Sequence, residues 1–78
     1  MGVVLDDAGI TAAVKAKLLA DTMVSGLKID VDTREGVVYL TGDNINSQAE
    51  IDQAMKLARE TSGVKTVESK LVVGDVQN

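Results

Sequence analysis

The 78-residue chain contains no cysteine, histidine, tryptophan or phenylalanine, and Tyr39 is its only aromatic residue. Without cysteine, neither disulfides nor thiolate metal sites stabilise the fold. Without histidine, the commonest general base and metal ligand is missing. The sequence also lacks a glycine-rich phosphate-binding loop. We therefore expect a protein that is not an enzyme and that carries no cofactor.

The charge balance and the short apolar runs argue against further classes of protein, namely nucleic-acid binders and membrane-spanning proteins. The net charge is −4, whereas a binder of single-stranded nucleic acid needs a basic groove and stacking rings, so we expect no nucleic-acid partner. The same charge argues against attachment to anionic membranes by a polybasic patch. No apolar run is long enough to span a bilayer, and the first residues lack the pattern of a signal peptide.

Apolar residues spaced three and four apart predict two helices. The first begins with Asp7 as its N-cap and ends near Asp21. Its apolar stripe is Ile10, Ala13, Val14 and Leu18. The second begins at Ser47, which forms a capping box with Glu50, and Gly63 is placed as its C′ residue. Its apolar stripe is Ile51, Ala54, Met55 and Ala58.

Three segments alternate between apolar and polar residues, as half-buried strands do. They are residues 27–33, residues 37–41 ending at Gly42, and residues 64–73. Two interpretations suit the glycines that bracket the second strand: close approach of a ligand, or a turn at Gly36 and strand termination at Gly42. We favour the second interpretation, because a hairpin needs a residue with positive φ at its turn.

The order helix, strand, strand, helix, strand predicts an α+β fold, a two-layer αββαβ sandwich. We expect a three-stranded mixed sheet covered on one face by two helices. Strands one and two form an antiparallel hairpin, and the second helix is a right-handed crossover to a parallel third strand. Residues 6–73 form a single domain, and residues 1–5 and 74–78 are flexible tails.

Three stretches resemble the BON domain family, the bacterial OsmY and nodulation domain. They are "DDAGITAAVKAKLLAD", "EGVVYLTG" and "SQAEIDQAMKLARETSGVKTVESKLVV". The positions that carry the resemblance are Gly36, Val38, Leu40, Gly42, Ala54, Ala58, Gly63, Val64, Val67 and Leu71. The resemblance implies an αββαβ fold and a non-enzymatic module of the bacterial envelope. It also implies a periplasmic location and weak association with phospholipid in osmotic or envelope stress. The sequence departs from many periplasmic members in having one copy, and it lacks aromatic rings that anchor at lipid headgroups.

Two acidic or amide-rich stretches contain oxygen ligands that could bind an ion. Residues 30–35 depart from the calcium-loop pattern, because Arg34 stands where a ligand is needed and Glu35 where glycine is needed. Asp43, Asn44 and Asn46 offer oxygen ligands for a weak cation site, or they form turns by bonding their own backbone. We favour turns and expect no specific metal site.

Two function hypotheses follow. In the first, the domain contacts phospholipid through Lys15, Lys56 and Arg59, which are otherwise solvated helix residues with ion pairs. In the second, the domain binds an envelope protein or another copy through Val37, Tyr39 and Val72 on the open sheet face. A lipid binder should have basic residues clustered around exposed apolar ones. We take the isolated chain to be a monomer.

Overall fold

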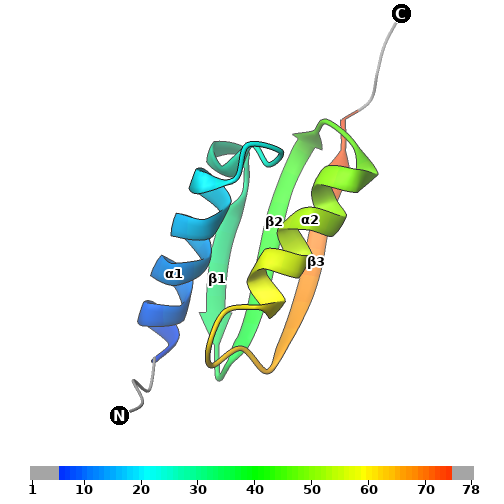
Figure 1. Cartoon of the computed structure of the whole chain (residues 1–78). Coiled ribbons are helices and arrows are strands. Elements are labelled where there is room, and N and C mark those ends of the chain that lie inside the picture. The colour runs from blue at the N-terminus through cyan, green and yellow to red at the C-terminus, as the bar shows by residue number, and fades with distance from the viewer. Residues whose placement is uncertain (1–5, 75–78) are drawn as a thin grey trace, which may run out of the picture.

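The computed structural model describes residues 6–74 and shows two helices lying on one face of a sheet (Figure 1). Of the expected tails at 1–5 and 74–78, residues 1–5 and 75–78 lie outside the described residues. Gly74 is described, and its amide donates to Ile45 O at 2.7 Å. The elements in order are α1 (Asp7–Ala20), the 3₁₀ helix η1 (Gly26–Lys28), β1 (Asp30–Arg34), β2 (Val37–Ile45), α2 (Gln48–Arg59) and β3 (Thr66–Val73). The predicted α+β sandwich is confirmed.

The sheet is mixed, with β2 in the centre between β1 and β3. β1 pairs antiparallel with β2, and β3 pairs parallel with β2, as predicted. Val38 lies opposite Thr33 on one side and Val67 on the other, and all three face the helices. Their neighbours along each strand point to the opposite, open face, because side chains alternate along a strand.

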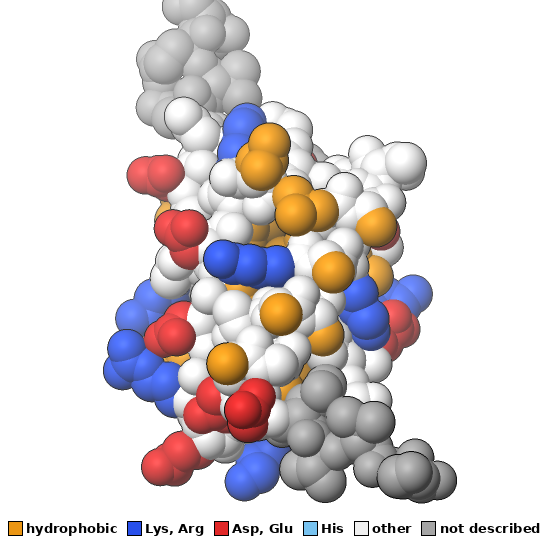
Figure 2. Space-filling view, turned by 90° about the vertical axis from the view of Figure 1, so that its left-hand side faces the viewer, with side chains coloured by type: hydrophobic (Ala, Val, Ile, Leu, Met, Phe, Trp, Pro, Cys, Tyr) orange, Lys and Arg blue, Asp and Glu red, His pale blue; other side chains and the backbone are white. Residues whose placement is uncertain are grey.

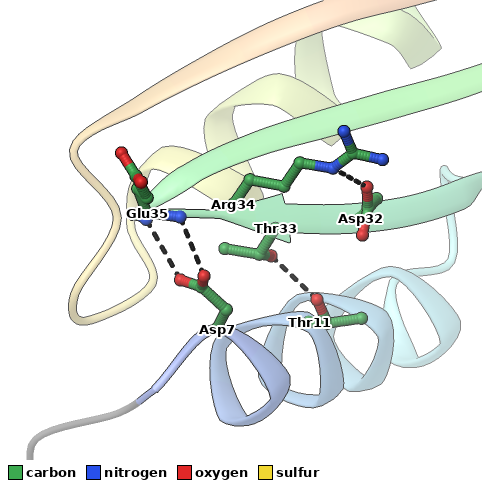
Figure 3. Close-up of polar contacts among 7 residues, drawn as sticks. Asp7, Thr11, Asp32, Thr33, Arg34 and Glu35 are labelled. Atoms are coloured by element: carbon green, nitrogen blue, oxygen red, sulfur yellow. Dashed lines mark hydrogen bonds and ion pairs between the residues drawn. The ribbon is translucent and has the colours of Figure 1, made fainter.

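The N-cap of α1 lies one residue earlier than predicted. The side chain of Asp6 caps the helix by accepting a hydrogen bond from the Gly9 amide at 2.8 Å, so the assignment of Asp7 as the cap is wrong. The Asp7 carboxylate instead accepts from the amides of Glu35 at 2.8 Å and Gly36 at 3.1 Å. These two bonds hold the hairpin turn against the start of α1 (Figure 3).

The Glu35-Gly36 turn has positive φ at both residues, 52° and 82°. Two left-handed residues in a two-residue hairpin are the pattern of a type I′ turn, which matches the twist of the flanking strands. The predicted role of Gly36 in the turn is therefore confirmed. Close by, the Thr11 hydroxyl donates to the Thr33 hydroxyl at 2.8 Å and joins α1 to β1 (Figure 3).

The predicted strand at 27–33 begins later than expected. Gly26–Lys28 forms η1, in which the Lys28 amide donates to Ser25 O at 2.9 Å and the Ile29 amide to Gly26 O at 3.2 Å. Leu27 was expected to share the buried side of the strand with Ile29, and this is wrong: it is 93% exposed. The alternation continues only from Ile29 onwards, because a tight helical turn occupies the preceding residues.

β2 also differs from the prediction, because it continues past Gly42 to Ile45. The register shifts between Gly42 and Ile45, where Asn44 has a φ of 60°, as in a β-bulge. A Cβ atom on Gly42 would lie 2.5 Å from the carbonyl oxygen of Lys28. Gly42 therefore permits a close approach of two backbone segments and does not terminate the strand.

α2 begins as predicted, with the Ser47 hydroxyl accepting from the Glu50 amide at 3.2 Å. The return half of the capping box is not formed as expected, since the Glu50 carboxylate accepts from the Ser25 amide at 2.8 Å. Gly63, with a φ of 90°, lies in the turn after the C-cap residue Glu60 and is not the C′ residue. The buried apolar core is Ile10, Val14, Leu18, Val24, Ile29, Val31, Val38, Leu40, Ile45, Ile51, Ala54 and Ala58.

Candidate functional site

Three large apolar side chains are exposed near the C-terminal end of α1. Leu27 is 93% exposed, Leu19 58% and Met23 51%. Leu19 lies on the solvent side of α1, one residue past the buried Leu18, and Met23 lies in the connection to η1. Water-exposed leucines at one end of a small domain are a feature of interaction surfaces.

Local contacts hold this connection in place and turn these side chains outward. Val24 is buried and anchors the chain between α1 and η1. The Ser25 amide donates to Glu50, which lies on α2 and is only 2% exposed. A Cβ on Gly26 would lie 2.9 Å from the backbone of Leu18. Because glycine allows this approach, η1 lies directly against the end of α1 and leaves Leu27 in water.

Basic side chains lie beside these apolar ones. Lys15 lies one turn before Leu19 on the same side of α1, and both line a hollow of about 190 Å³ with Leu27. Lys28 follows Leu27, is exposed, and donates from Nζ to Asn44 O at 3.3 Å. Figure 2 shows hydrophobic side chains gathered on this side of the molecule with basic ones among them. We call Lys15, Leu19, Met23, Leu27 and Lys28 the α1–η1 surface.

The rest of the outer side of α1 is poor in charge. Its exposed residues include Ala8, Ala12, Ala16 and Ala20. A surface helix normally carries charged residues opposite its buried stripe, as α2 does with Asp52, Lys56 and Arg59. The α1–η1 surface therefore continues along α1 as a weakly polar strip of small side chains.

The three predicted lipid contacts do not form one cluster. Lys56 and Arg59 are exposed on the solvent side of α2. Lys15 lies on α1 and lines a hollow together with Ile29 and Asp30, at the start of β1. The side of α2 that faces α1 carries Gln53, which donates to Asp21 at 3.0 Å. The structure thus separates Lys15 from the α2 pair and places it with exposed leucines instead.

The open face of the sheet carries the three predicted partner contacts. Val37 and Tyr39 are half-buried, and Val72 is 57% exposed. A shallow hollow of about 390 Å³ lies over this face, and its lining residues are Asp32, Arg34, Tyr39, Thr41 and Lys70. Lys70 lines this hollow together with Tyr39, and it lines a second hollow together with Val72. The face is therefore a mixed surface rather than a continuous apolar patch.

Two observations bear on the ion sites considered from the sequence. Within residues 6–74, no three histidine, cysteine, aspartate or glutamate side chains are grouped as metal ligands. In the loop considered for a cation, Asn44 has a left-handed backbone within the β2 bulge, and its carbonyl accepts from Lys28. Asp43 and Asn44 therefore belong to β2 and its bulge, and the interpretation of these two residues as a turn is wrong.

One carboxylate at the edge of the site has a shifted pKa. The Gln53 side chain and the Met23 amide both donate to Asp21, and they lower its pKa below the ordinary value of 3.8. Hydrogen bonds to a carboxylate favour its charged form. Asp21 therefore links the end of α1 to α2 as an ionised group.

Sequence reasoning missed Leu19, Met23, Leu27 and Lys28 as candidate surface residues. Alternation placed Leu27 on the apolar side of a half-buried strand, and only the tertiary contact of Gly26 with α1 shows otherwise. One signal was present: Leu19 lies off the stripe of Ile10, Val14 and Leu18.

The sequence profile of the BON domain matches residues 6–75. This chain belongs to the BON domain family. The glycines on which the resemblance was partly based have structural roles in this fold, as the turn at Gly36 and the close approach at Gly42 show.

Two curated relatives match this BON domain over most of its length. The osmotically-inducible protein Y of Escherichia coli is 43% identical over 65 residues, which cover 83% of this chain and 32% of that protein. The 21 kDa hemolysin of Actinobacillus pleuropneumoniae is 39% identical over 67 residues, covering 86% of this chain and 34% of that protein. The chain thus spans about a third of the length of these relatives. No helix within residues 6–74 is long and apolar enough to cross a bilayer.

Proposed function

We propose that this BON domain is a non-enzymatic binding module of the bacterial cell envelope that associates weakly with phospholipid membranes. The observation that carries the proposal is the α1–η1 surface, where exposed Leu19 and Leu27 lie beside Lys15 and Lys28. Apolar side chains that enter the headgroup region, with lysines beside them to contact phosphate, are what a peripheral lipid-binding surface requires.

The expected affinity is low. Partial burial of two leucines contributes about 1 kcal/mol each, and each lysine near an anionic surface contributes about 1 kcal/mol. A total of about 4 kcal/mol corresponds to a dissociation constant of about 1 mM. The net charge of −4 and the absence of tryptophan and phenylalanine anchors agree with weak, headgroup-dependent binding.

The relatives support a setting for this activity. One of them is named for osmotic induction and the other as a hemolysin. We propose that this domain acts in the periplasm, with a role in osmotic or envelope stress.

An NMR titration tests the proposal. The ¹⁵N-labelled domain is titrated with phosphatidylglycerol-containing micelles, and with neutral phosphatidylcholine micelles as a control. We expect shifts confined to the α1–η1 surface and larger with the anionic lipid. No shifts with either lipid would remove the membrane role.

Two matched double variants locate the site. Lys15→Glu with Lys28→Glu changes the α1–η1 surface, and Lys56→Glu with Arg59→Glu changes α2, and both lower the net charge by the same amount. We expect the first pair to abolish the shifts and the second to preserve most of them. If only the α2 variant loses the shifts, lipid binding would instead be assigned to α2. If both double variants lose them equally, the binding would be non-specific electrostatic attraction.

A second candidate function is protein binding at the open sheet face. The hollow beside Tyr39, with Arg34 and Lys70 in its lining, is the observation in its favour. Tyr39→Ser and Val72→Ser would then abolish capture of an envelope protein, while lysine substitutions on α1 would leave it unchanged.

A further inference from the structure

Within residues 6–74, the outer edge of β3 has no neighbouring strand. Among the described residues, β3 pairs only with β2. The Leu71 amide donates to the Ser69 hydroxyl at 3.2 Å and is therefore turned away from the β2 ladder. Because peptide groups alternate in direction along a strand, those of Val67 and Ser69 point to the same free edge.

This edge lacks most of the features that prevent strands from pairing. Edges are commonly protected by proline, by bulges, by charged side chains or by a covering segment, and of these β3 carries the charged residues Glu68 and Lys70. The register of β3 with β2 is regular from Thr66 to Leu71, and the chain contains no proline. On the side facing the helices, Val67, Leu71 and Met55 are only half-buried. Apolar surface therefore borders an unpaired row of backbone donors and acceptors.

We infer that β3 pairs with β3 of a second copy of this chain, antiparallel and centred on Ser69. In this register Glu68 lies opposite Lys70 of the second copy, and Lys70 lies opposite its Glu68. Val67 lies opposite Leu71 of the second copy on the helix side. The Ser69 peptide groups of the two copies pair with each other. The sequence of the strand, Thr66–Val73, is thus complementary to itself.

The hydrogen-bonding direction agrees with this register. The edge-facing residues Val67, Ser69 and Leu71 form the hydrogen-bonded pairs. Glu68 and Lys70 then occupy non-hydrogen-bonded pairs, in which opposing side chains are closest. Both residues are exposed on the open face, so their charges meet without the desolvation cost of a buried ion pair.

Neighbouring registers are unfavourable. A shift by two residues places Glu68 opposite Glu68, or Lys70 opposite Lys70, and like charges directly opposite destabilise a sheet. A shift by one residue would place the helices of the two copies on opposite faces of the joined sheet. It would also bring edge-facing peptide groups of one copy opposite peptide groups of the other that face away. Charge and backbone direction therefore select a single symmetric arrangement, in which the two sheets join into one.

The association is expected to be weak, because each copy adds one strand to a small interface. The dilute chain is then monomeric, and the dimer forms at high concentration. Sedimentation equilibrium without lipid should show a dimer with a dissociation constant between about 10 µM and 1 mM. A monomer throughout the range up to about 1 mM would overturn the inference.

Charge exchange tests the register. Lys70→Glu and Glu68→Lys each place like charges opposite one another twice per dimer, so each should weaken the dimer about fivefold or more. The double variant Glu68→Lys with Lys70→Glu restores opposite charges and should recover the dimer. Lys15→Glu, which changes the net charge as Lys70→Glu does but lies on α1, is the matched control and should leave association unchanged. If all variants dimerise equally, the contact is not at this edge.

A cross-link gives an independent result. In the proposed dimer the two Ser69 Cα atoms are about 5.5 Å apart, within the range of a disulfide. Because the chain has no cysteine, Ser69→Cys should form a covalent dimer on mild oxidation, faster than Ser62→Cys in the turn after α2. Equal rates for the two variants would contradict the pairing.

Discussion

Among single residues, Asp7 makes the contact that decides the shape of one end of the molecule. Its carboxylate accepts from the amides of Glu35 and Gly36, two donors of a turn that otherwise bond to water. Because a charged acceptor strengthens a hydrogen bond, Asp7 joins α1 to the hairpin despite its partial exposure.

Replacing Asp7 should therefore destabilise the fold. Asp7→Ala is expected to lower the free energy of unfolding by about 1 to 2 kcal/mol, and Asp7→Asn, which keeps one acceptor oxygen, by less. Urea denaturation followed by circular dichroism measures both values. An Asp7→Ala variant as stable as the parent would show that water replaces the carboxylate without loss.

The turn residues predict opposite effects of two substitutions. Gly36→Val forces a β-branched residue to a φ of 82° and should cost about 1 kcal/mol or more. Position 35 has a φ of 52°, and asparagine tolerates this left-handed backbone conformation better than glutamate does. Glu35→Asn should therefore stabilise the hairpin by about 0.5 kcal/mol. Thermal melts of both variants provide the test. A stability gain from valine at position 36 would contradict the turn assignment.

Between elements, Glu50 is the polar link that positions the candidate site. It lies on α2, is only 2% exposed, and accepts from the Ser25 amide just before η1. This bond satisfies a donor in the connection between α1 and η1 and helps keep Leu27 at the surface.

Loss of that acceptor should have a large effect. Glu50→Ala leaves the Ser25 amide without its partner and is expected to cost about 2 kcal/mol of unfolding free energy. Glu50→Gln keeps an acceptor oxygen and should cost less. Hydrogen exchange of the Ser25 amide reports the bond directly, and unchanged exchange in Glu50→Ala would show that the bond contributes nothing.

For the whole molecule, Asp21 predicts how stability changes in acid. Gln53 and the Met23 amide lower its folded pKa below 3.8, so the folded state holds this proton less tightly than the unfolded chain does. The stabilisation from Asp21 is then fully present above pH 3.8 and is lost as the pH falls through the lower, folded value.

Asp21→Asn removes this dependence. The variant should be less stable than the parent at neutral pH, and the difference should shrink between about pH 5 and pH 2. Denaturation curves across that range measure it. A constant difference at every pH would assign the effect of the substitution to something other than the charge of Asp21.

Much of the fold follows from local patterns that the sequence alone contains. The stripe of Ile10, Val14 and Leu18 specifies α1, the Ser47 hydroxyl specifies the start of α2, and Gly36 specifies the turn. These features depend on residues within a few positions of one another, so periodicity and capping chemistry are sufficient to predict them. The family resemblance then agreed with the order and pairing of the elements.

Only the tertiary structure decided the features that join distant segments. The contact of Gly26 with the end of α1 removed Leu27 from the strand. Gly42 lies against Lys28 O and does not end β2, which continues to Ile45. The carboxylates of Asp7 and Glu50 accept hydrogen bonds from the amides of Glu35 and Ser25, which lie 28 and 25 residues away in the sequence. Such contacts depend on how helices lie on the sheet, and side-chain alternation carries no information about that placement. The candidate surface formed by Leu19, Leu27 and Lys15 exists for the same reason.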